Sequence, residues 1–377
     1  MRALVSILVL LSFAPRAADA ATWVVRPGES IQAAVDAAVS GDTILVRPGS
    51  YGGNGGAALV HVRTSGLTLR GSASAVLDAS GYRHGVLVGE QPRAGAEPCP
   101  EPSVRGFELV GFTVRGAGES ALRLEGVDGF SLRDGVYLDN ARHGASLVCA
   151  AHGAIGNGYL AGHGAAAIEV AASSHVTVEE TSVTASVIGI AIENSTHVLV
   201  RRNQVFGNGA GVAIAVQPQR PVPHTDRVRI EDNAIIENNL ARPATPGVAT
   251  FVTTLPSGVG ILNAGGDHVA IERNVVLGND SFGVAALASP LAHLDSRSDS
   301  FVDAQSVQRN VILMNGHDPD PLRAAVPGAD IVFVPDRIDF QSGAIVEPDP
   351  DPSDNCYGEN RFFTDSPMEV TGSLACP

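Results

Sequence analysis

The stretch VLVRRNQVFGNGAGVAIAV, residues 198–216, contains the pattern from which the fold can be inferred. Its alternating apolar residues come in three groups, which are Val198 with Val200, then Val205, and then Val212, Ile214 and Val216. Alternation with a period of two is typical of short β-strands that bury one face. Asn203 and the pair Asn208–Gly209 lie between the groups, and both residue types favour turns. The stretch therefore predicts three short strands joined by tight turns.

Related segments recur along the chain. The position of Asn203 is occupied in successive copies by Phe112, Gly135, Gly158, Thr181, Asn203, Asn233, Asn274 and Asn310. The early copies are 22 or 23 residues apart, and the later steps lengthen to 30, 41 and 36 residues. A short repeat of this kind is typical of a solenoid whose coils stack about 4.8 Å apart. The four asparagines predict a ladder in which each side-chain amide bonds to the next coil.

Residues 23–44 form a second unit. WVVRPGESIQAAV, residues 23–35, is followed by GDTI, residues 41–44. The pattern predicts a strand, a short amphipathic helix with Ile31, Val35 and Ala38 on one face, and another strand. Such a helix would cover the open end of a solenoid, where apolar side chains and backbone groups lack neighbours.

This opening unit and the asparagine column resemble the right-handed parallel β-helix (pectate-lyase-like) superfamily. The repeats are also similar to those of bacterial extracytoplasmic parallel β-helix repeat proteins. The resemblance implies an all-β fold, namely a single-stranded right-handed parallel β-helix solenoid with an N-terminal capping helix. We expect about nine coils within residues 21–315, followed by an irregular C-terminal capping segment at residues 316–377. The fold alone does not identify a function.

Residues 1–20 have the features of a signal peptide. Arg2 precedes an apolar run over residues 3–14, and ADA, residues 18–20, matches a cleavage site. We therefore expect cleavage between Ala20 and Ala21 and a periplasmic or secreted protein. The apolar run is too short for a stable membrane span, so no transmembrane segment is expected.

The four cysteines would then lie in an oxidising compartment, where disulfides form. Three pairings are available to four cysteines. The pairing of Cys356 with Cys376 closes a short C-terminal loop and is favoured, which leaves Cys99 with Cys149. The sequence has no CxxC or zinc-type spacing, so we expect no metal-binding or redox motif.

Composition excludes several function classes. The formal net charge is -15, from 25 basic and 40 acidic residues, and every basic residue is arginine. A negative surface disfavours nucleic acid, and the lack of lysine excludes a lysine Schiff base. Only 12 Phe, 5 Tyr and 1 Trp are present, so aromatic platforms for sugars are scarce. We expect a monomer.

The resemblance places a substrate cleft along the first sheet, which follows the turn after the asparagine ladder. Insertions at residues 89–103, 218–226, 240–257 and 289–303 fall beside this sheet. Long loops on one side of a rigid scaffold often form binding sites, although insertions without a ligand are the alternative.

Alternation along the first-sheet strands predicts which side chains point outward to the cleft. They are Arg123, Glu125, Ser146, Glu169, Glu193 and Gln217. Glu169 and Glu193 are 24 residues apart, about one coil, so their carboxyl groups could lie roughly 5 Å apart. Such a pair can perform acid–base catalysis; two solvated carboxylates are the alternative.

Three histidines precede glycine near one turn, at His84, His143 and His163. Gly162-His163-Gly164 resembles a motif of polygalacturonase-type hydrolases, but the other motifs of that family are absent, and a structural role in the turn is the alternative. The candidate catalytic residues are His143, His163 and Glu169. The candidate substrate-binding residues are Arg123, Glu125, Asp139, Asn140, Arg142 and Glu193.

Three functions remain open. The first is binding of a polysaccharide or glycoconjugate, with processing of that ligand as an extension. The second is a polysaccharide lyase, hydrolase or epimerase, and the third is a non-catalytic accessory protein that binds an exported partner. No cofactor is required by these hypotheses. Calcium at Asp349, Asp351 and Asp354 is one interpretation of the segment EPDPDPSD, residues 347–354, and a solvated loop is the favoured one.

Overall fold

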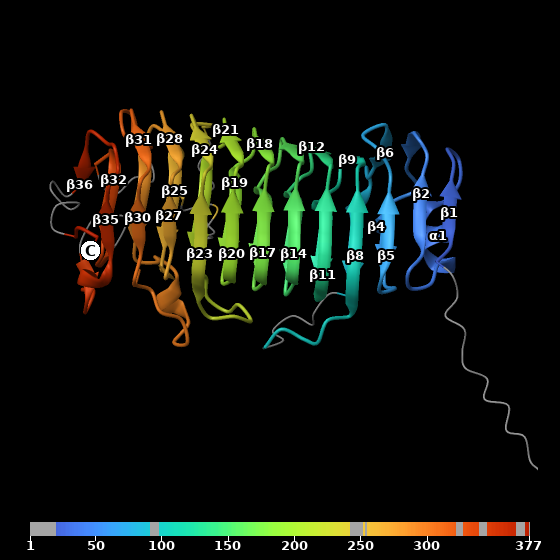
Figure 1. Cartoon of the computed structure of the whole chain (residues 1–377), viewed down its shortest axis with the longest axis horizontal. Coiled ribbons are helices and arrows are strands. Elements are labelled where there is room, and N and C mark those ends of the chain that lie inside the picture. Colours follow the sequence, from blue (N-terminus) through green and yellow to red (C-terminus); the bar gives the residue numbers. More distant parts are fainter. Residues whose placement is uncertain are drawn as a thin grey trace, which may run out of the picture.

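Three long parallel sheets wind around one axis (Figure 1). The computed structural model describes residues 20–90, 98–241, 252, 255–321, 327–338, 345–366 and 374–376. Within this part of the chain the three sheets contain 13, 10 and 11 strands, and we name them sheets A, B and C. Most coils contribute one strand to each sheet, in the order A, B, C, so the expected parallel β-solenoid is confirmed.

Sheet A faces the viewer in Figure 1. Its strands are β1 (Thr22–Val25), β2 (Thr43–Val46), β5 (Leu67–Arg70), β8 (Val104–Val110), β11 (Val127–Arg133), β14 (Ala151–Gly156), β17 (Ser174–Glu179), β20 (Thr196–Arg201), β23 (Thr225–Glu231), β26 (Gly266–Asp267), β27 (Ala270–Glu272), β30 (Ser306–Gln308) and β35 (Cys356–Gly358).

Sheet B consists of short strands along the upper edge of Figure 1. They are β3 (Gly49–Tyr51), β6 (Ala75–Asp78), β9 (Thr113–Arg115), β12 (Val136–Leu138), β15 (Tyr159–Ala161), β18 (Ser182–Thr184), β21 (Gln204–Phe206), β24 (Ala234–Ile236), β28 (Val275–Leu277) and β31 (Val311–Leu313). The ten strands of this sheet correspond to ten coils, one more than the expected number of about nine.

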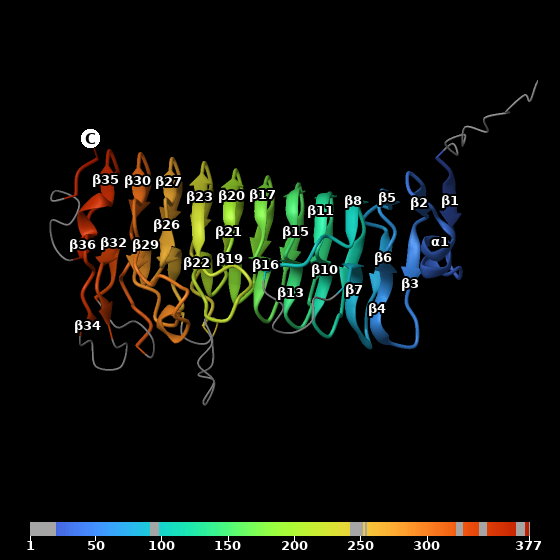
Figure 2. The same cartoon turned by 90° about the horizontal axis from the view of Figure 1, so that it is seen from below.

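Sheet C is the first sheet of the sequence-based expectation, since it follows the turn after the ladder. Its strands are β4 (Gly56–Val62), β7 (Tyr82–Gly89), β10 (Ser120–Glu125), β13 (His143–Val148), β16 (Ala166–Ala171), β19 (Ile188–Glu193), β22 (Ala210–Ala215), β25 (Val259–Ala264), β29 (Phe282–Leu287), β32 (Ala329–Val334) and β36 (Asp365–Ser366). Several of them are labelled in Figure 2.

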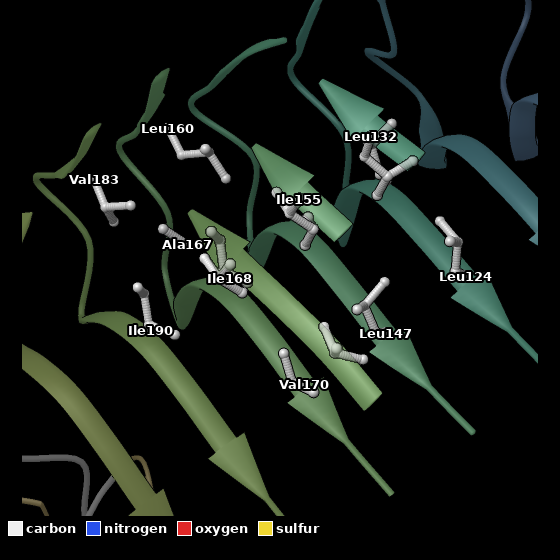
Figure 3. Packing of buried hydrophobic residues seen from close by; sticks show 14 of the residues in the cluster. Leu124, Leu132, Leu147, Ile155, Leu160, Ala167, Ile168, Val170, Val183 and Ile190 are labelled. Atoms are coloured by element: carbon white, nitrogen blue, oxygen red, sulfur yellow. The ribbon is translucent and has the colours of Figure 1, made fainter. Parts of the chain in front are cut away.

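The interior is filled by columns of apolar side chains (Figure 3). Leu124, Leu147 and Val170 occupy paired positions on β10, β13 and β16, and each is fully buried. Burying a side chain of this size stabilises the folded state by about 1.5–3 kcal/mol. Because the same column runs through successive coils, each coil depends on its neighbours for burial.

The asparagine ladder is confirmed. Asn203, Asn233, Asn274 and Asn310 are buried, and each side-chain oxygen accepts a hydrogen bond from the backbone N–H of the preceding ladder residue, at 2.8–3.0 Å. A second ladder follows sheet B and was not predicted. It contains Asn208, Asn238, Asn279 and Asn315 with the same bonding.

The helix α1 (Ile31–Ala37) covers the N-terminal end of the solenoid, as expected. Ile31 and Val35 are buried against the core, and the Ser30 hydroxyl caps the helix by accepting from the Ala33 N–H. The Gln32 side chain pairs with the outermost strand β4, where it donates to the His61 carbonyl at 3.1 Å and accepts from the His61 N–H at 2.6 Å. In the described part of the chain, no helix has the length and hydropathy that crossing a membrane requires.

The C-terminal segment differs from the expected irregular cap. β32 and β36 extend sheet C, and β35 extends sheet A. Asn360 also continues the asparagine ladder, because its side-chain oxygen accepts from the Asn310 N–H. The solenoid therefore continues beyond residue 315. The only antiparallel pair among the described residues is β33 (Arg337–Ile338) with β34 (Ile345–Glu347), and short 3-10 helices lie at Ala292–Leu294 and Pro352–Asp354.

Both expected disulfides are confirmed, since Cys99 pairs with Cys149 and Cys356 with Cys376. Residues 1–19, which make up nearly all of the expected signal peptide, lie outside the described residues.

Candidate functional site

A cavity of about 330 Å³ lies on the outer face of sheet C. This volume falls at the lower end of the range for ligand pockets. Its lining comes from β13, β16, β19 and loop residues beside them, namely Arg142, His143, Gly164, Ala165, Ala166, Glu169, Ile188, Ala191, Glu193, Gln217, Arg220 and Val252. A hollow of about 510 Å³ beside α1 is larger, but Glu29 is the only carboxylate in its lining. We therefore place the candidate site in the smaller cavity.

A row of polar side chains on three successive coils ends at the cavity, and Glu169 is its member in the lining. Arg123 of β10, Ser146 of β13 and Glu169 of β16 occupy paired positions. The Arg123 guanidinium donates to the Ser146 hydroxyl at 2.6 Å and lies 3.6 Å from the Glu169 carboxylate. The Ser146 hydroxyl in turn donates to Glu169. The one-coil spacing of the strands thus holds the Glu169 carboxylate in a fixed position.

His143 stands beside this row. Its Nε2 is 3.8 Å from the Glu169 carboxylate, and its Nδ1 lies 3.4 Å from the hydroxyl of Ser120, which occupies the paired position on β10. The imidazole therefore contacts both Glu169 and a second polar group.

Glu193 and Arg220 line the cavity beside Glu169. Glu193 ends β19, and its carboxylate accepts from the Arg220 guanidinium at 2.5 Å. Arg220 lies in the insertion after β22. The adjacent Gln219 N–H donates to Asp295 at 3.0 Å, and Asp295 belongs to the insertion after β29. Two insertions therefore cooperate to bring Arg220 to the cavity.

The two carboxyl groups have pKa values that move in opposite directions. Burial raises the pKa of Glu193 to about 7, against the opposing effect of Arg220, and the charge of Glu169 adds to the increase. Burial also acts to raise the pKa of Glu169, but His143, Arg123 and Ser146 together hold it below its ordinary value. Burial lowers the pKa of His143 as well, with Glu169 opposing. At neutral pH the cavity therefore contains one ionised carboxylate, Glu169, and one carboxyl group, Glu193, that is protonated in part of the molecules.

Four of the predicted site residues meet in this cavity, which are Arg142, His143, Glu169 and Glu193. The predicted pairing of the two glutamates needs correction. Glu169 pairs with Ala191, and Glu193 pairs with Ala171, so the glutamates are diagonal neighbours and do not lie directly opposite. The coil at this point has 22 residues, which explains the offset of two positions.

Arg123 and Glu125 lie outside the cavity lining. Both point away from the interior as predicted, but Glu125 is only 2% exposed and accepts from Arg123 at 2.7 Å. Arg123 therefore positions Glu169, and direct contact of Glu125 with a substrate is not supported.

His163, Asp139 and Asn140 belong to the turns between sheets B and C. Asn140 continues the second ladder on an earlier coil, since its side chain accepts from the Ala117 N–H at 3.0 Å, and on the next coil the His163 N–H donates to the Ser186 hydroxyl at 3.2 Å. His163 is 2% exposed, and both of its ring nitrogens are buried without a hydrogen-bond partner of good geometry. Asp139 is exposed in the turn. The structure thus places these three candidates outside the cavity.

Arg220 is the cavity residue that sequence reasoning missed. An arginine inside a predicted cleft insertion was a usable signal, but the contact with Glu193 depends on the folding of two loops. Calcium binding at Asp349, Asp351 and Asp354 stays a prediction. Within the described ranges, no group of three or more His, Cys, Asp or Glu side chains is arranged to hold a metal ion.

The sequence pattern of the family described as "Right handed beta helix region" matches residues 103–293, which is half of the chain. The chain belongs to this family. The matched part of this right-handed β-helix protein contains every described residue of the cavity lining.

Solved structures share the fold of this right-handed β-helix protein. The A-module of mannuronan C-5 epimerase AlgE6 from Azotobacter vinelandii has a TM-score of 0.59 and 15% identity, over 88% of this chain and 81% of that chain. DFA-IIIase from Arthrobacter chlorophenolicus A6 has a TM-score of 0.51 and 13% identity, over 89% of this chain and 80% of that chain. A search of curated protein sequences found no significant match.

Proposed function

We propose that the protein binds a carbohydrate in the cavity on sheet C and cleaves a glycosidic bond there by acid–base catalysis. The observation that carries the proposal is the pair Glu169 and Glu193, which share one cavity and have pKa values shifted in opposite directions. Environments that separate the pKa values of two carboxyl groups assign one as base and the other as acid. Carbohydrate-active proteins among the structural neighbours support the choice of substrate class.

In this reaction the protonated Glu193 donates its proton to the oxygen of the leaving sugar. The ionised Glu169 accepts a proton from a water molecule, whose oxygen bonds to the anomeric carbon as the glycosidic bond breaks. Proton exchange with solvent then restores both carboxyl groups. Arg123 and Ser146 hold Glu169 in place, and Arg220 orients Glu193.

A lyase or epimerase is the second candidate, and His143 favours it. Its imidazole lines the cavity with Nε2 3.8 Å from the Glu169 carboxylate, so it is placed to accept a proton from a sugar carbon.

The test is a screen of neutral and acidic polysaccharides with the purified protein, beside Glu169→Gln, Glu193→Gln and His143→Gln variants. Hydrolysis produces new reducing ends without an unsaturated product, whereas a lyase produces ultraviolet-absorbing unsaturated sugars. Turnover that survives in both glutamate variants would refute the proposed mechanism. Glu179→Gln on sheet A is the matched control, because Glu179 also pairs with an arginine but lies away from the cavity.

We further propose that residues 1–20 are removed on export to an oxidising compartment. The Ala21 N–H donates to Asp42 at 2.7 Å, and Asp42 is almost completely buried. Cleavage after Ala20 would turn this nitrogen into an ammonium group, whose charge Asp42 is placed to neutralise. N-terminal sequencing of the exported protein should begin at Ala21, and a different first residue would contradict the proposal.

A further inference from the structure

The glycine-rich segment GGNGG, residues 52–56, leads from the end of β3 into β4. Gly55 has a φ of +92°, in the left-handed region that glycine adopts readily. The backbone at Gly53 is not left-handed, but a side chain at this position would overlap the Tyr82 hydroxyl. The lack of a side chain at Gly53 therefore makes room for the Tyr82 phenol beside this turn.

The hollow of about 510 Å³ lies between this turn and the start of α1, at the N-terminal end of the solenoid (Figure 2). Its volume falls within the range of about 300–1,000 Å³ that is usual for ligand pockets. Its lining comes from residues 28–32, residues 50–55, Ala58 with Leu59 of β4, and Tyr82 of β7. The cap and the first coils of the solenoid therefore enclose the hollow together.

Three side chains in the lining can bind hydroxyl groups. Tyr82 is partly exposed and Asn54 is exposed, and neither side chain has a hydrogen-bond partner in the described part of the chain. Glu29 is exposed as well, and its carboxylate accepts from the Arg26 N–H at 2.7 Å, which leaves further lone pairs to accept from a ligand. The phenol and the amide supply donors, and all three groups supply acceptors.

The rest of the lining indicates the chemical class of the ligand. Its described residues include no arginine or histidine, so no cationic side chain is present to pair with a phosphate, sulfate or carboxylate. Ala58, Leu59 and the Tyr82 ring add apolar surface. A sugar ring combines a face of C–H groups with hydroxyl groups around its edge. An uncharged sugar therefore matches this combination of apolar surface and a few polar groups.

We propose that this hollow is a second carbohydrate-binding site, which holds a neutral saccharide through hydrogen bonds to Glu29, Asn54 and Tyr82 and through contact with the Tyr82 ring. The site binds without catalysis, because Glu29 is the only carboxylate among its described lining residues and has no second carboxyl group to complete an acid–base pair. The proposal does not depend on the reaction proposed for the cavity, whose lining comes from β13, β16, β19 and the loops beside them.

Isothermal titration calorimetry tests the proposal with neutral oligosaccharides of glucose, galactose, mannose, xylose or fructose. The wild-type protein should bind at least one of them, and Tyr82→Ala and Gly53→Ala should each weaken this binding by about tenfold or more. Tyr159→Ala is the matched control, because Tyr159 is an exposed tyrosine on sheet B outside the hollow, and it should bind like the wild type. Thermal unfolding checks that each variant is folded. Binding of no neutral probe, or unchanged affinity in folded Tyr82→Ala or Gly53→Ala, would overturn the proposal.

Hydrogen–deuterium exchange tests the location of the site separately. A bound neutral oligosaccharide should slow amide exchange in residues 50–59, whereas an oligogalacturonate, as the acidic probe, should not. Slower exchange confined to β13, β16 and β19 would place the binding in the cavity and overturn the proposal. Neither measurement requires turnover, so a failure of the proposed reaction and a failure of this site are distinguishable.

Discussion

The two ends of the outer face of sheet C have the same backbone but opposite chemistry. Along one row of paired positions, β10, β13 and β16 present Arg123, Ser146 and Glu169, whereas β19, β22 and β25 present Ala191, Ala213 and Leu262. The second group belongs to a buried apolar cluster that continues to Ala285 and Val332. The change from charged to apolar occurs between neighbouring coils, at Glu169 and Ala191, and the cavity lies at this boundary.

This difference shows that the solenoid supplies equivalent positions and that the side chains decide what each position does. At the apolar end, overlying segments are packed on the sheet by hydrophobic burial. At the polar end, burial instead shifts the pKa values of ionisable groups, because charges there are removed from water. The same covering of the sheet therefore stabilises one end and shifts the pKa values of carboxyl groups at the other.

The largest expected effect is on catalysis at the polar end. Glu193→Gln removes the proposed acid without changing the shape of the side chain, so turnover should fall by about 100- to 10,000-fold. The melting temperature should not fall, since an amide at this site has no charge to bury. A large loss of stability together with the loss of activity would instead indicate a structural role for Glu193.

At the apolar end, Leu262→Asp should mainly affect stability. An unpaired carboxylate in this buried cluster should lower the free energy of unfolding by about 3 kcal/mol. Turnover per folded molecule should be close to that of the wild type at low temperature. Urea unfolding and activity assays on the same samples separate the two effects. A strong loss of turnover in fully folded protein would break the distinction between the two ends.

Substitution of His163 should change the stability of the protein in acid, and it should leave catalysis unchanged. Burial lowers its pKa from 6.5 to about 4, so the unfolded chain binds a proton more readily between these pH values. The stability present above pH 6.5 is therefore lost as the pH falls towards 4, and the loss from this residue is on the order of 3 kcal/mol. His163→Asn places a ladder residue there. Relative to the wild type, it should be less sensitive to acid in urea unfolding from pH 7 to pH 4 and should keep its turnover.

The pH profile of turnover should give the smallest effect. Activity should decline as the pH rises above about 7, because Glu193 then loses its proton. Arg220 opposes the increase in the pKa of Glu193, so Arg220→Met should raise this pKa further and move the decline to higher pH. A decline that moves to lower pH would contradict the assignment of Glu193 as the acid. Arg201→Met on sheet A, remote from the cavity, should leave the profile unchanged.

The parts predictable from sequence are those that repeat. The ladder through Asn203 and the first sheet followed from a spacing of 22 or 23 residues, because every coil repeats the same contacts. The interior role of His163 was less visible, since the second ladder begins with Asn140, His163 and Ser186 and becomes uniform only at Asn208. The early members of the second ladder occupy equivalent positions on successive coils, but they are different types of residue.

The candidate site was predictable in part for the same reason. Strand alternation placed Glu169 and Glu193 outward, yet it could not show that Glu125 is buried or that Arg220 reaches Glu193. The position of Arg220 depends on insertions, whose conformations follow from long-range contacts such as that between Gln219 and Asp295. The coil between β16 and β19 has 22 residues, whereas Glu169 and Glu193 are 24 residues apart. The two glutamates are therefore offset by two positions, and the sequence alone did not show the length of this coil.

The contact of Gln32 with β4 has a consequence for filament growth. A stack of equivalent coils has no fixed length, because the unpaired backbone groups of its end strand can pair with a further strand. The Gln32 side-chain amide donates to the His61 carbonyl and accepts from the His61 N–H. It thus makes the two hydrogen bonds that the backbone of another coil would make at His61. We expect this contact to block the pairing of a further strand with β4, so replacing Gln32 should favour association of chains at this end of sheet C.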